Sequence, residues 1–167
     1  PDQARRFKNH LHRQLEDSRE PDLNYVVVGG GPTGIELAGA LTHYLREIMK
    51  AHGIKRRAIH VDLVEAAPTL VPRMPKQMGN SIARRLRKLG VRIYLDKRVE
   101  GATADALTID GKPIQSHTIV WTAGTANHPF FKGNDFKLNE RGKVAVDDYL
   151  QAEPDIFVLG DNAATQY

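Results

Sequence analysis

Three glycines in the first quarter of the chain have a spacing that suits contact with phosphate groups. Gly29, Gly31 and Gly34 follow the order G-x-G-x-x-G, directly after the apolar run from Tyr25 to Val28 and directly before an apolar-periodic segment. We expect Gly29 to turn the chain sharply, Gly31 to admit a pyrophosphate close to the backbone, and Gly34 to let a helix pack on a strand. Strand, turn and helix in this order predict a dinucleotide-binding site.

The residues between these glycines are expected to complete the cradle for the phosphates. Gly30 lies inside the turn, and Pro32 and Thr33 begin the helix. A helix N-terminus offers unpaired N–H groups and a positive dipole end to an anion, and a proline in the first turn loses no needed donor. The alternative interpretation is a glycine-rich connection that binds no ligand.

An acidic residue follows the second expected strand, residues 58–64. At this position Glu65 is placed to accept hydrogen bonds from the hydroxyls of an adenosine ribose. It lies about thirty residues past Gly34 rather than the usual ~20, because the helix is long and a loop at residues 55–57 follows it. No arginine follows to receive a 2′-phosphate, so we predict NAD(H) rather than NADP(H). The alternative is that Glu65 only caps a strand in solvent.

A parallel sheet with flanking helices is needed to position these residues. Apolar periodicity predicts helices and strands in alternation, with helices over 2–19, 33–52 and 78–89 and strands over 25–28, 58–64 and 91–95. Because such crossovers are right-handed, this order predicts an α/β fold with a Rossmann-like core of three parallel strands.

Short strands follow this core. Residues 98–102, 106–109 and 118–122 alternate with turn residues, including a turn at 110–113, and predict a small antiparallel β-meander. Its last strand, residues 118–122, returns as a buried strand and ends in a turn of small residues that can pass close to a ligand.

Composition limits the other classes of function. The 167 residues carry a net charge of +4 in short basic groups without interleaved aromatic residues, so nucleic acid is not expected as a partner. Cysteine is absent, which leaves no disulfide and no thiol nucleophile in the chain. His10 and His12 stand on different helical faces, so we expect no metal site there. No apolar run approaches the ~18 residues of a membrane span.

A second motif near the C-terminus places another carboxylate beside a strand. Residues 156–159 read as a strand that runs into Gly160-Asp161, at the end of a strand where ligands of α/β sheets bind. Together with VVVGGGPTGIELAGAL, VDLVEAAPTLVP and IVWTAGT in this order, the motif resembles the FAD-dependent pyridine nucleotide (disulfide) oxidoreductases. Within that family the chain is most similar to the type II NADH dehydrogenases, the NADH:quinone oxidoreductases.

The resemblance implies roles for particular residues. The glycine turn matches the NADH pyrophosphate turn of the family, and Glu65 matches its adenosine-ribose acid. Asp161 matches the aspartate that holds the ribityl chain of FAD, and Ala123-Gly124 matches the turn that crosses toward the flavin domain. Glu36 matches a carboxylate on the nicotinamide and flavin side and is the candidate catalytic residue; the alternative is a glutamate that the helix dipole favours.

The chain also departs from the family pattern. It begins with Pro1 rather than Met, contains one G-x-G-x-x-G where the family has two, and lacks the C-terminal membrane-docking region. We therefore expect a fragment with three parts: an N-terminal helix and linker (1–22), the NAD(H)-binding domain (23–125), and a return segment (126–167) that forms short edges of an incomplete flavin-binding domain. Such a fragment is not expected to hold FAD tightly or to turn over alone.

The resemblance implies an enzyme that transfers hydride from NADH to FAD and then electrons to a quinone. Two alternatives stay open: an NADH-dependent reductase of rubredoxin or ferredoxin, and a regulatory module that senses NAD(H). The Gly-Asp motif argues against the module, which has no use for a ribityl-binding aspartate. The full-length protein is expected in the cytoplasm, peripheral at the inner membrane face, as a homodimer, with membrane contact made by regions absent here.

Overall fold

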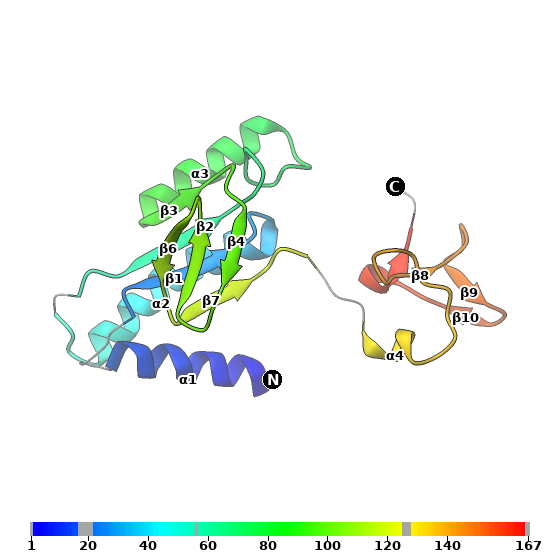
Figure 1. The fold of residues 1–167 in the computed structure, drawn as a ribbon, viewed down its shortest axis with the longest axis horizontal. Helices are drawn as coiled ribbons and strands as arrows, with labels where there is room; N and C mark the ends of the chain where they lie inside the picture. Colours follow the sequence, from blue (N-terminus) through cyan, green and yellow to red (C-terminus); the bar gives the residue numbers. More distant parts are fainter. Residues whose placement is uncertain (1, 17–21, 56, 125–127, 166–167) are drawn as a thin grey trace. The chain divides into compact units, whose positions relative to one another are not determined.

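The computed structural model describes residues 2–16, 22–55, 57–124 and 128–165, and the chain forms two compact units, Pro1–Ala123 and Gly124–Tyr167 (Figure 1). The first unit contains the glycine turn and the second contains the Gly-Asp motif. Among the helices of the described residues, none combines the length and the apolar character that crossing a bilayer requires.

Three helices and seven strands make up the described part of the first unit. In chain order they are α1 (Asp2–Glu16), β1 (Asn24–Val28), α2 (Pro32–Ala51), β2 (His60–Val64), α3 (Lys76–Leu89), β3 (Val91–Tyr94), β4 (Val99–Ala102), β5 (Ala106–Ile109), β6 (Lys112–Gln115) and β7 (Thr118–Trp121). A parallel sheet has the strand order β3-β2-β1-β7, and β4, β5 and β6 form an antiparallel meander (Figure 1). The predicted α/β fold with a Rossmann-like sheet and a small meander is confirmed.

The parallel sheet is covered on both faces. Alternate residues of β1 point to opposite sides, so Tyr25 and Val27 join the core formed with α1, α2 and α3, whereas Val26 and Val28 pack against the meander. A sheet buried on both faces needs strands that are apolar throughout, which explains the continuous run from Tyr25 to Val28. The first unit therefore has three layers, with helices, parallel sheet and meander in that order.

Strand β7 belongs to the parallel sheet and not, as predicted, to the meander. We expected residues 118–122 to be the last strand of the meander, but β7 pairs in parallel with β1, with Tyr25 opposite Thr118. The third strand of the meander is β6, which begins directly after a two-residue turn at Asp110 and Gly111. Both turn residues have positive φ, 51° and 67°, and such a turn joins adjacent antiparallel strands. Pro113 fits in β6 because β6 is an edge strand.

Helix α1 belongs to the core of the first unit. Its Leu11 and Leu15 are fully buried against α2 and the sheet. The helix was predicted over residues 2–19; α1 spans Asp2–Glu16, and the remaining three positions lie outside the described residues. The end of α3 agrees with its prediction, since Gly90 caps it with a positive φ of 97°.

Asp22 is a buried carboxylate between α1 and β1. It is 3% exposed, and its Oδ1 accepts a hydrogen bond from the backbone N–H of His117 at 3.2 Å. Removal from water raises the pKa of Asp22 above 3.8. Contacts with Thr118 and His117 lower the pKa, but their effect is smaller. Its contribution to stability is therefore fully present below pH 3.8 and is lost as the pH rises through the higher pKa of the folded state.

Asp22→Asn is expected to raise the free energy of unfolding at pH 7, because it removes the buried charge and keeps an acceptor for His117 N–H. The gain should shrink as the pH falls and Asp22 of the parent chain becomes protonated. Urea unfolding of both proteins between pH 7 and pH 3.5 measures this difference. A gain that stays constant with pH would contradict the expectation.

The second unit is small and built from short elements. They are α4 (Pro129–Lys132), β8 (Val144–Ala145), β9 (Gln151–Glu153), β10 (Ile156–Phe157), the 3₁₀ turn η1 (Gly160–Asn162) and β11 (Ala163–Ala164). Strands β8 and β11 pair in parallel, β9 and β10 pair antiparallel, and Val144, Val158 and Ala163 form the buried centre. The strand predicted over residues 156–159 is shorter, because the chain leaves the β10 pairing after Phe157 and turns into η1.

Candidate functional site

The glycine turn lies at the carboxyl end of β1, where the order of the sheet strands reverses. Strands β2 and β3 follow on one side of β1, and β7 pairs on the other, so the reversal lies between β1 and β7. In open α/β sheets ligands bind outside the carboxyl ends of the strands at such a point. The turn therefore occupies the position that this topology reserves for a ligand.

Gly29 is required by the backbone and by its neighbours. Its φ is +115°, and a Cβ placed on it would lie 2.8 Å from Ala123 N and from Thr122 Oγ1. Its N–H donates to Val64 O at 2.8 Å, and Thr122 Oγ1 donates to Val28 O at 2.9 Å, which fastens the turn between β2 and β7. Thr122 was not among the predicted site residues, although it belongs to the motif IVWTAGT, which could have indicated it.

Gly34 and Gly31 differ in what surrounds them. A Cβ on Gly34 would lie 1.9 Å from Gly29 O, so α2 packs directly on the turn. Gly31, the N-cap of α2, has ordinary extended angles of −76° and 179°, and a Cβ there would meet no atom within 4 Å. Neither the backbone nor the packing of the first unit requires a glycine at position 31. The open space beside it is the room that an approaching phosphate needs.

The N-terminus of α2 points its donors at this open space. Pro32 is the first helical residue, and Thr33 and Gly34 follow in the first turn. The N-cap residue Gly31 has no side chain that could cap their N–H groups. The first N–H groups of a helix have no partner within the helix, and together with the helix dipole they attract an anion.

Glu65 is tied to the glycine turn by its side chain. Its Oε2 accepts a hydrogen bond from Gly30 N at 2.5 Å, and its Oε1 accepts one from Ala67 N at 2.8 Å. The side chain is half-buried, so the alternative of a strand cap in open solvent does not describe it. Each carboxylate oxygen can accept a second hydrogen bond, so Glu65 can still accept hydrogen bonds from hydroxyl groups of a ligand.

Gly30 makes room for this contact, a role that was not predicted from the sequence. A Cβ on Gly30 would lie 2.7 Å from the Leu70 side chain and 2.9 Å from Glu65 Oε2. Its carbonyl accepts a hydrogen bond from Val71 N at 2.9 Å, and Val71 is held at a φ of +43°, which is strained for a β-branched residue. The loop after Glu65 is thus fastened to the turn.

The remaining predicted site residues lie outside this group. Glu36 is exposed on α2, with no ion pair or hydrogen bond from its side chain to a described residue. Ala123 ends the first unit beside Gly29, whereas Gly124, with a φ of +115°, begins the second. Asp161 lies exposed in η1 of the second unit. The first unit therefore brings together the glycine turn, Glu65 and Ala123, and Gly124 and Asp161 belong to the other unit.

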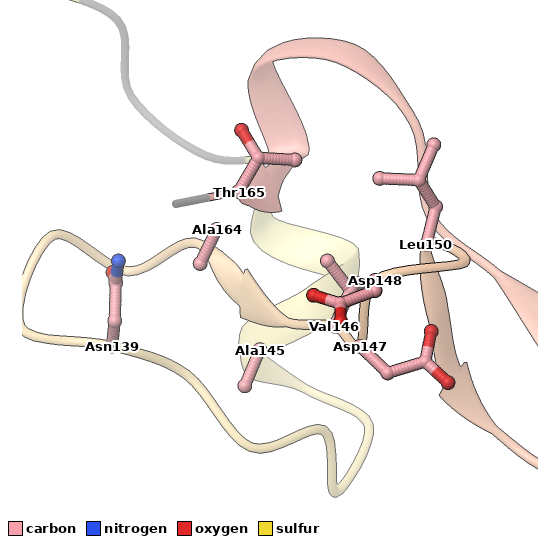
Figure 2. A pocket seen from close by; sticks show the side chains of 8 residues that line it. All are labelled: Asn139, Ala145, Val146, Asp147, Asp148, Leu150, Ala164 and Thr165. Carbon is pink, nitrogen blue, oxygen red and sulfur yellow. The ribbon is translucent and has the colours of Figure 1, made fainter. Parts of the chain in front are cut away.

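An open hollow of about 680 Å³ occurs within the second unit (Figure 2). Two of its polar side chains already serve their own turns. Asn139 Oδ1 accepts from Arg141 N and Lys143 N, and Asp147 Oδ1 accepts from Tyr149 N and Gln151 N. Asp161 does not line this hollow. We therefore assign the candidate site to the glycine turn.

A glycine turn at the centre of a parallel sheet, with a helix N-terminus and a fixed carboxylate beside it, has the architecture of a Rossmann-type dinucleotide-binding domain. Residues 2–167 match the family described as pyridine nucleotide-disulphide oxidoreductase, and the chain belongs to that family.

Relatives in this family carry names that describe NADH oxidation. The chain is 33% identical to the type II NADH:quinone oxidoreductase Ndh of Mycobacterium tuberculosis, over 92% of this chain and 37% of the relative. It is also 33% identical to the type II NADH:quinone oxidoreductase of Haemophilus influenzae, over 97% of this chain and 42% of the relative. The chain thus spans about two fifths of the length of these curated relatives.

Solved structures share the fold. The chain superimposes on NDH2 from Plasmodium falciparum in complex with NADH with a TM-score of 0.82 and 18% identity, covering 97% of this chain and 38% of the other. The water-forming NADH oxidase of Lactobacillus brevis bound to NADH gives a TM-score of 0.68 at 23% identity. This match covers 96% of this chain and 33% of the other. At these identities the likeness establishes the fold alone.

Proposed function

We propose that the chain binds NADH at the glycine turn, as the reductant-binding part of an FAD-dependent NADH dehydrogenase. The observation that carries this proposal is the open space at Gly31, bordered by the uncapped N-terminus of α2 and by a turn to which Glu65 is tied. The names of the curated relatives, which are NADH:quinone oxidoreductases, support the same assignment.

Two parts of NADH, the pyrophosphate and the adenosine ribose, have groups in the first unit that suit them. The pyrophosphate would lie beside Gly31 and accept hydrogen bonds from the N–H groups of Thr33 and Gly34. The adenosine ribose would donate its hydroxyl protons to Glu65, whose orientation the backbone N–H of Gly30 already fixes. Because a 2′-phosphate would meet the negative charge of Glu65, the site should favour NADH over NADPH.

FAD and the final acceptor belong to the proposal for the complete protein. Asp161 is an exposed carboxylate suited to ribityl hydroxyls, and Ala123-Gly124 is the turn that leads from one unit to the other. FAD would supply an acceptor for hydride from NADH, and the chain would contribute mainly positioning, with Glu36 as the candidate carboxylate near the nicotinamide.

A quinone is the proposed electron acceptor, on the strength of the names of the relatives. A quinone with an apolar tail partitions into a bilayer, so the proposal places the complete protein at the cytoplasmic face of the inner membrane. Membrane contact is assigned to parts of that protein outside this chain, and the complete protein is proposed to form a homodimer.

Glu65→Gln is expected to weaken NADH binding about tenfold, which corresponds to ~1.4 kcal/mol. The amide keeps the size of the side chain but loses the charge and one of the two acceptor atoms that hold the site together. The preference for NADH over NADPH should also shrink, because the charge that opposes the 2′-phosphate is gone. Calorimetric titration of both proteins with each nucleotide measures these changes.

Glu100→Gln is a matched control, since Glu100 Oε2 accepts a hydrogen bond from Gly111 N at 2.8 Å in the meander, away from the glycine turn. This variant should bind NADH as the parent chain does. If Glu65→Gln retains full affinity and full preference, Glu65 does not contact the ribose and the proposed position of the nucleotide is wrong.

A further inference from the structure

Three potential metal ligands meet at the end of α2 that lies far from the glycine turn. His12 and Glu16 stand one turn apart on α1, and His52 follows the last residue of α2. One nitrogen or oxygen of each lies within 4.8 Å of the other two. At 1.5 Å per residue, the 20 residues of α2 separate this cluster from the nucleotide site by about 30 Å.

The distances between these atoms suit a shared ion. His12 Nδ1 and His52 Nε2 are 3.2 Å apart, and His52 Nε2 and Glu16 Oε1 are 3.1 Å apart. Two ligand atoms bound tetrahedrally to Zn²⁺ at about 2.0–2.1 Å lie about 3.4 Å from each other. These two observed distances differ from the ligand spacing by a few tenths of an ångström, and the third pair of atoms, on His12 and Glu16, lies within 4.8 Å.

Hydrogen bonds within the cluster do not satisfy the three groups together. His52 Nε2 faces both His12 Nδ1 and Glu16 Oε1. A ring nitrogen carries either one proton or one lone pair. If it carries the proton, both neighbours compete for that proton; if it carries the lone pair, the lone pair faces a carboxylate. A cation bound by all three atoms removes this conflict.

Tyr44 completes the arrangement on the other side of His12. Its hydroxyl lies 3.2 Å from His12 Nε2, and the two rings meet edge to face with centroids 6.1 Å apart. If Nδ1 binds a metal, Nε2 keeps its proton and donates it to the Tyr44 oxygen. Histidine ligands usually make such a contact, which fixes the tautomer and the ring orientation.

We propose that His12, Glu16 and His52 bind one Zn²⁺ ion, or a divalent cation of the same class, with Tyr44 as a positioning residue. Two imidazoles and a carboxylate are ligands that Zn²⁺ accepts, and the partly exposed position of the cluster leaves room for water at a fourth position. The ion joins α1 to the C-terminal end of α2 and stabilises the packing of α1 on the core. This proposal is independent of the nucleotide site.

The test is a titration of the untagged chain with ZnCl₂ at pH 7.5, followed by calorimetry and by thermal unfolding. We expect one Zn²⁺ per chain, and the midpoint temperature of thermal unfolding should rise by about 5–10 °C at a hundredfold excess of Zn²⁺ over Kd. His12→Ala and His52→Ala should each weaken binding at least about tenfold, and Tyr44→Phe should weaken it by a smaller factor.

His43→Ala is the matched control. His43 Nε2 lies 3.3 Å from Glu47 Oε1 on an exposed turn of α2, an equivalent histidine–glutamate pair outside the three-residue cluster. This variant should bind Zn²⁺ as the parent chain does. The proposal would be overturned if His43→Ala lost as much Zn²⁺ affinity as His12→Ala and His52→Ala. It would also be overturned if both His12→Ala and His52→Ala bound Zn²⁺ as tightly as the parent chain.

Imidazole ¹⁵N spectra of the parent chain decide the question even if a variant fails to fold. Zn²⁺ should shift the Nδ1 resonance of His12 and the Nε2 resonance of His52 and leave His43 unchanged. Saturation with Zn²⁺ without these shifts, or the absence of saturable binding, would also refute the site.

Discussion

Gly31→Asp is expected to remove NADH binding while the fold stays at least as stable as before. Aspartate is a preferred N-cap residue, and the extended backbone angles of Gly31 suit it without strain. A Cβ there meets no atom within 4 Å, so packing does not change. The new carboxylate, however, occupies the proposed place of the pyrophosphate and repels its charge. We expect affinity to fall at least about 100-fold, or ~2.7 kcal/mol.

Gly31→Asn separates the two causes of this loss, because it has the same size as aspartate and no charge. It should bind NADH more tightly than Gly31→Asp and more weakly than the parent chain. Calorimetric titration gives the affinities, and urea unfolding gives the stabilities. NADH binding by Gly31→Asp at parental affinity would show that the pyrophosphate does not lie against the start of α2.

Gly34→Ala is expected to destabilise the first unit by at least about 3 kcal/mol. The added methyl group would lie 1.9 Å from Gly29 O and 2.7 Å from Thr122 Oγ1, and the first of these neighbours is a backbone atom that cannot rotate away. Relief requires α2 to move off the turn that connects it to β1. Urea unfolding followed by circular dichroism measures the loss.

Gly39→Ala is the control within the same helix. Its new Cβ would meet only side-chain carbons of Leu86 and Leu89, the nearer at 3.6 Å, which is an ordinary contact. Alanine also favours a helix over glycine, so this variant should gain about 0.5–1 kcal/mol. A Gly34→Ala protein as stable as its parent would mean that α2 does not pack on the turn as the structure has it.

Local patterns predicted the elements that form the glycine turn. A continuous apolar run, a G-x-G-x-x-G motif and helical periodicity each occur within a few residues, so β1, the turn and α2 could be predicted from their own sequence. The end of α3 at Leu89 was predicted for the same reason. The family resemblance rested on four such local motifs, and the match over residues 2–167 confirms it.

Features that depend on contacts between distant segments could not be predicted in this way. Strand β7 was assigned to the meander, because nothing in its own residues indicates pairing with β1, about ninety positions away. The fully buried Asp62 is stabilised by Arg92, whose Nη2 donates to Asp62 Oδ2 at 2.7 Å from a neighbouring strand. The contact of Glu65 with Gly30 and the meeting of His12 with His52 are also long-range.

The central claim is that NADH lies across the glycine turn, with its pyrophosphate at the N-terminus of α2. The most direct test is a titration of the ¹⁵N-labelled chain with NADH, followed in amide ¹H–¹⁵N spectra. We predict the largest shifts at Gly31, Thr33, Gly34 and Glu65, and small shifts around the hollow of the second unit. Shifts concentrated at residues 139–165, with the glycine turn unchanged, would contradict the account.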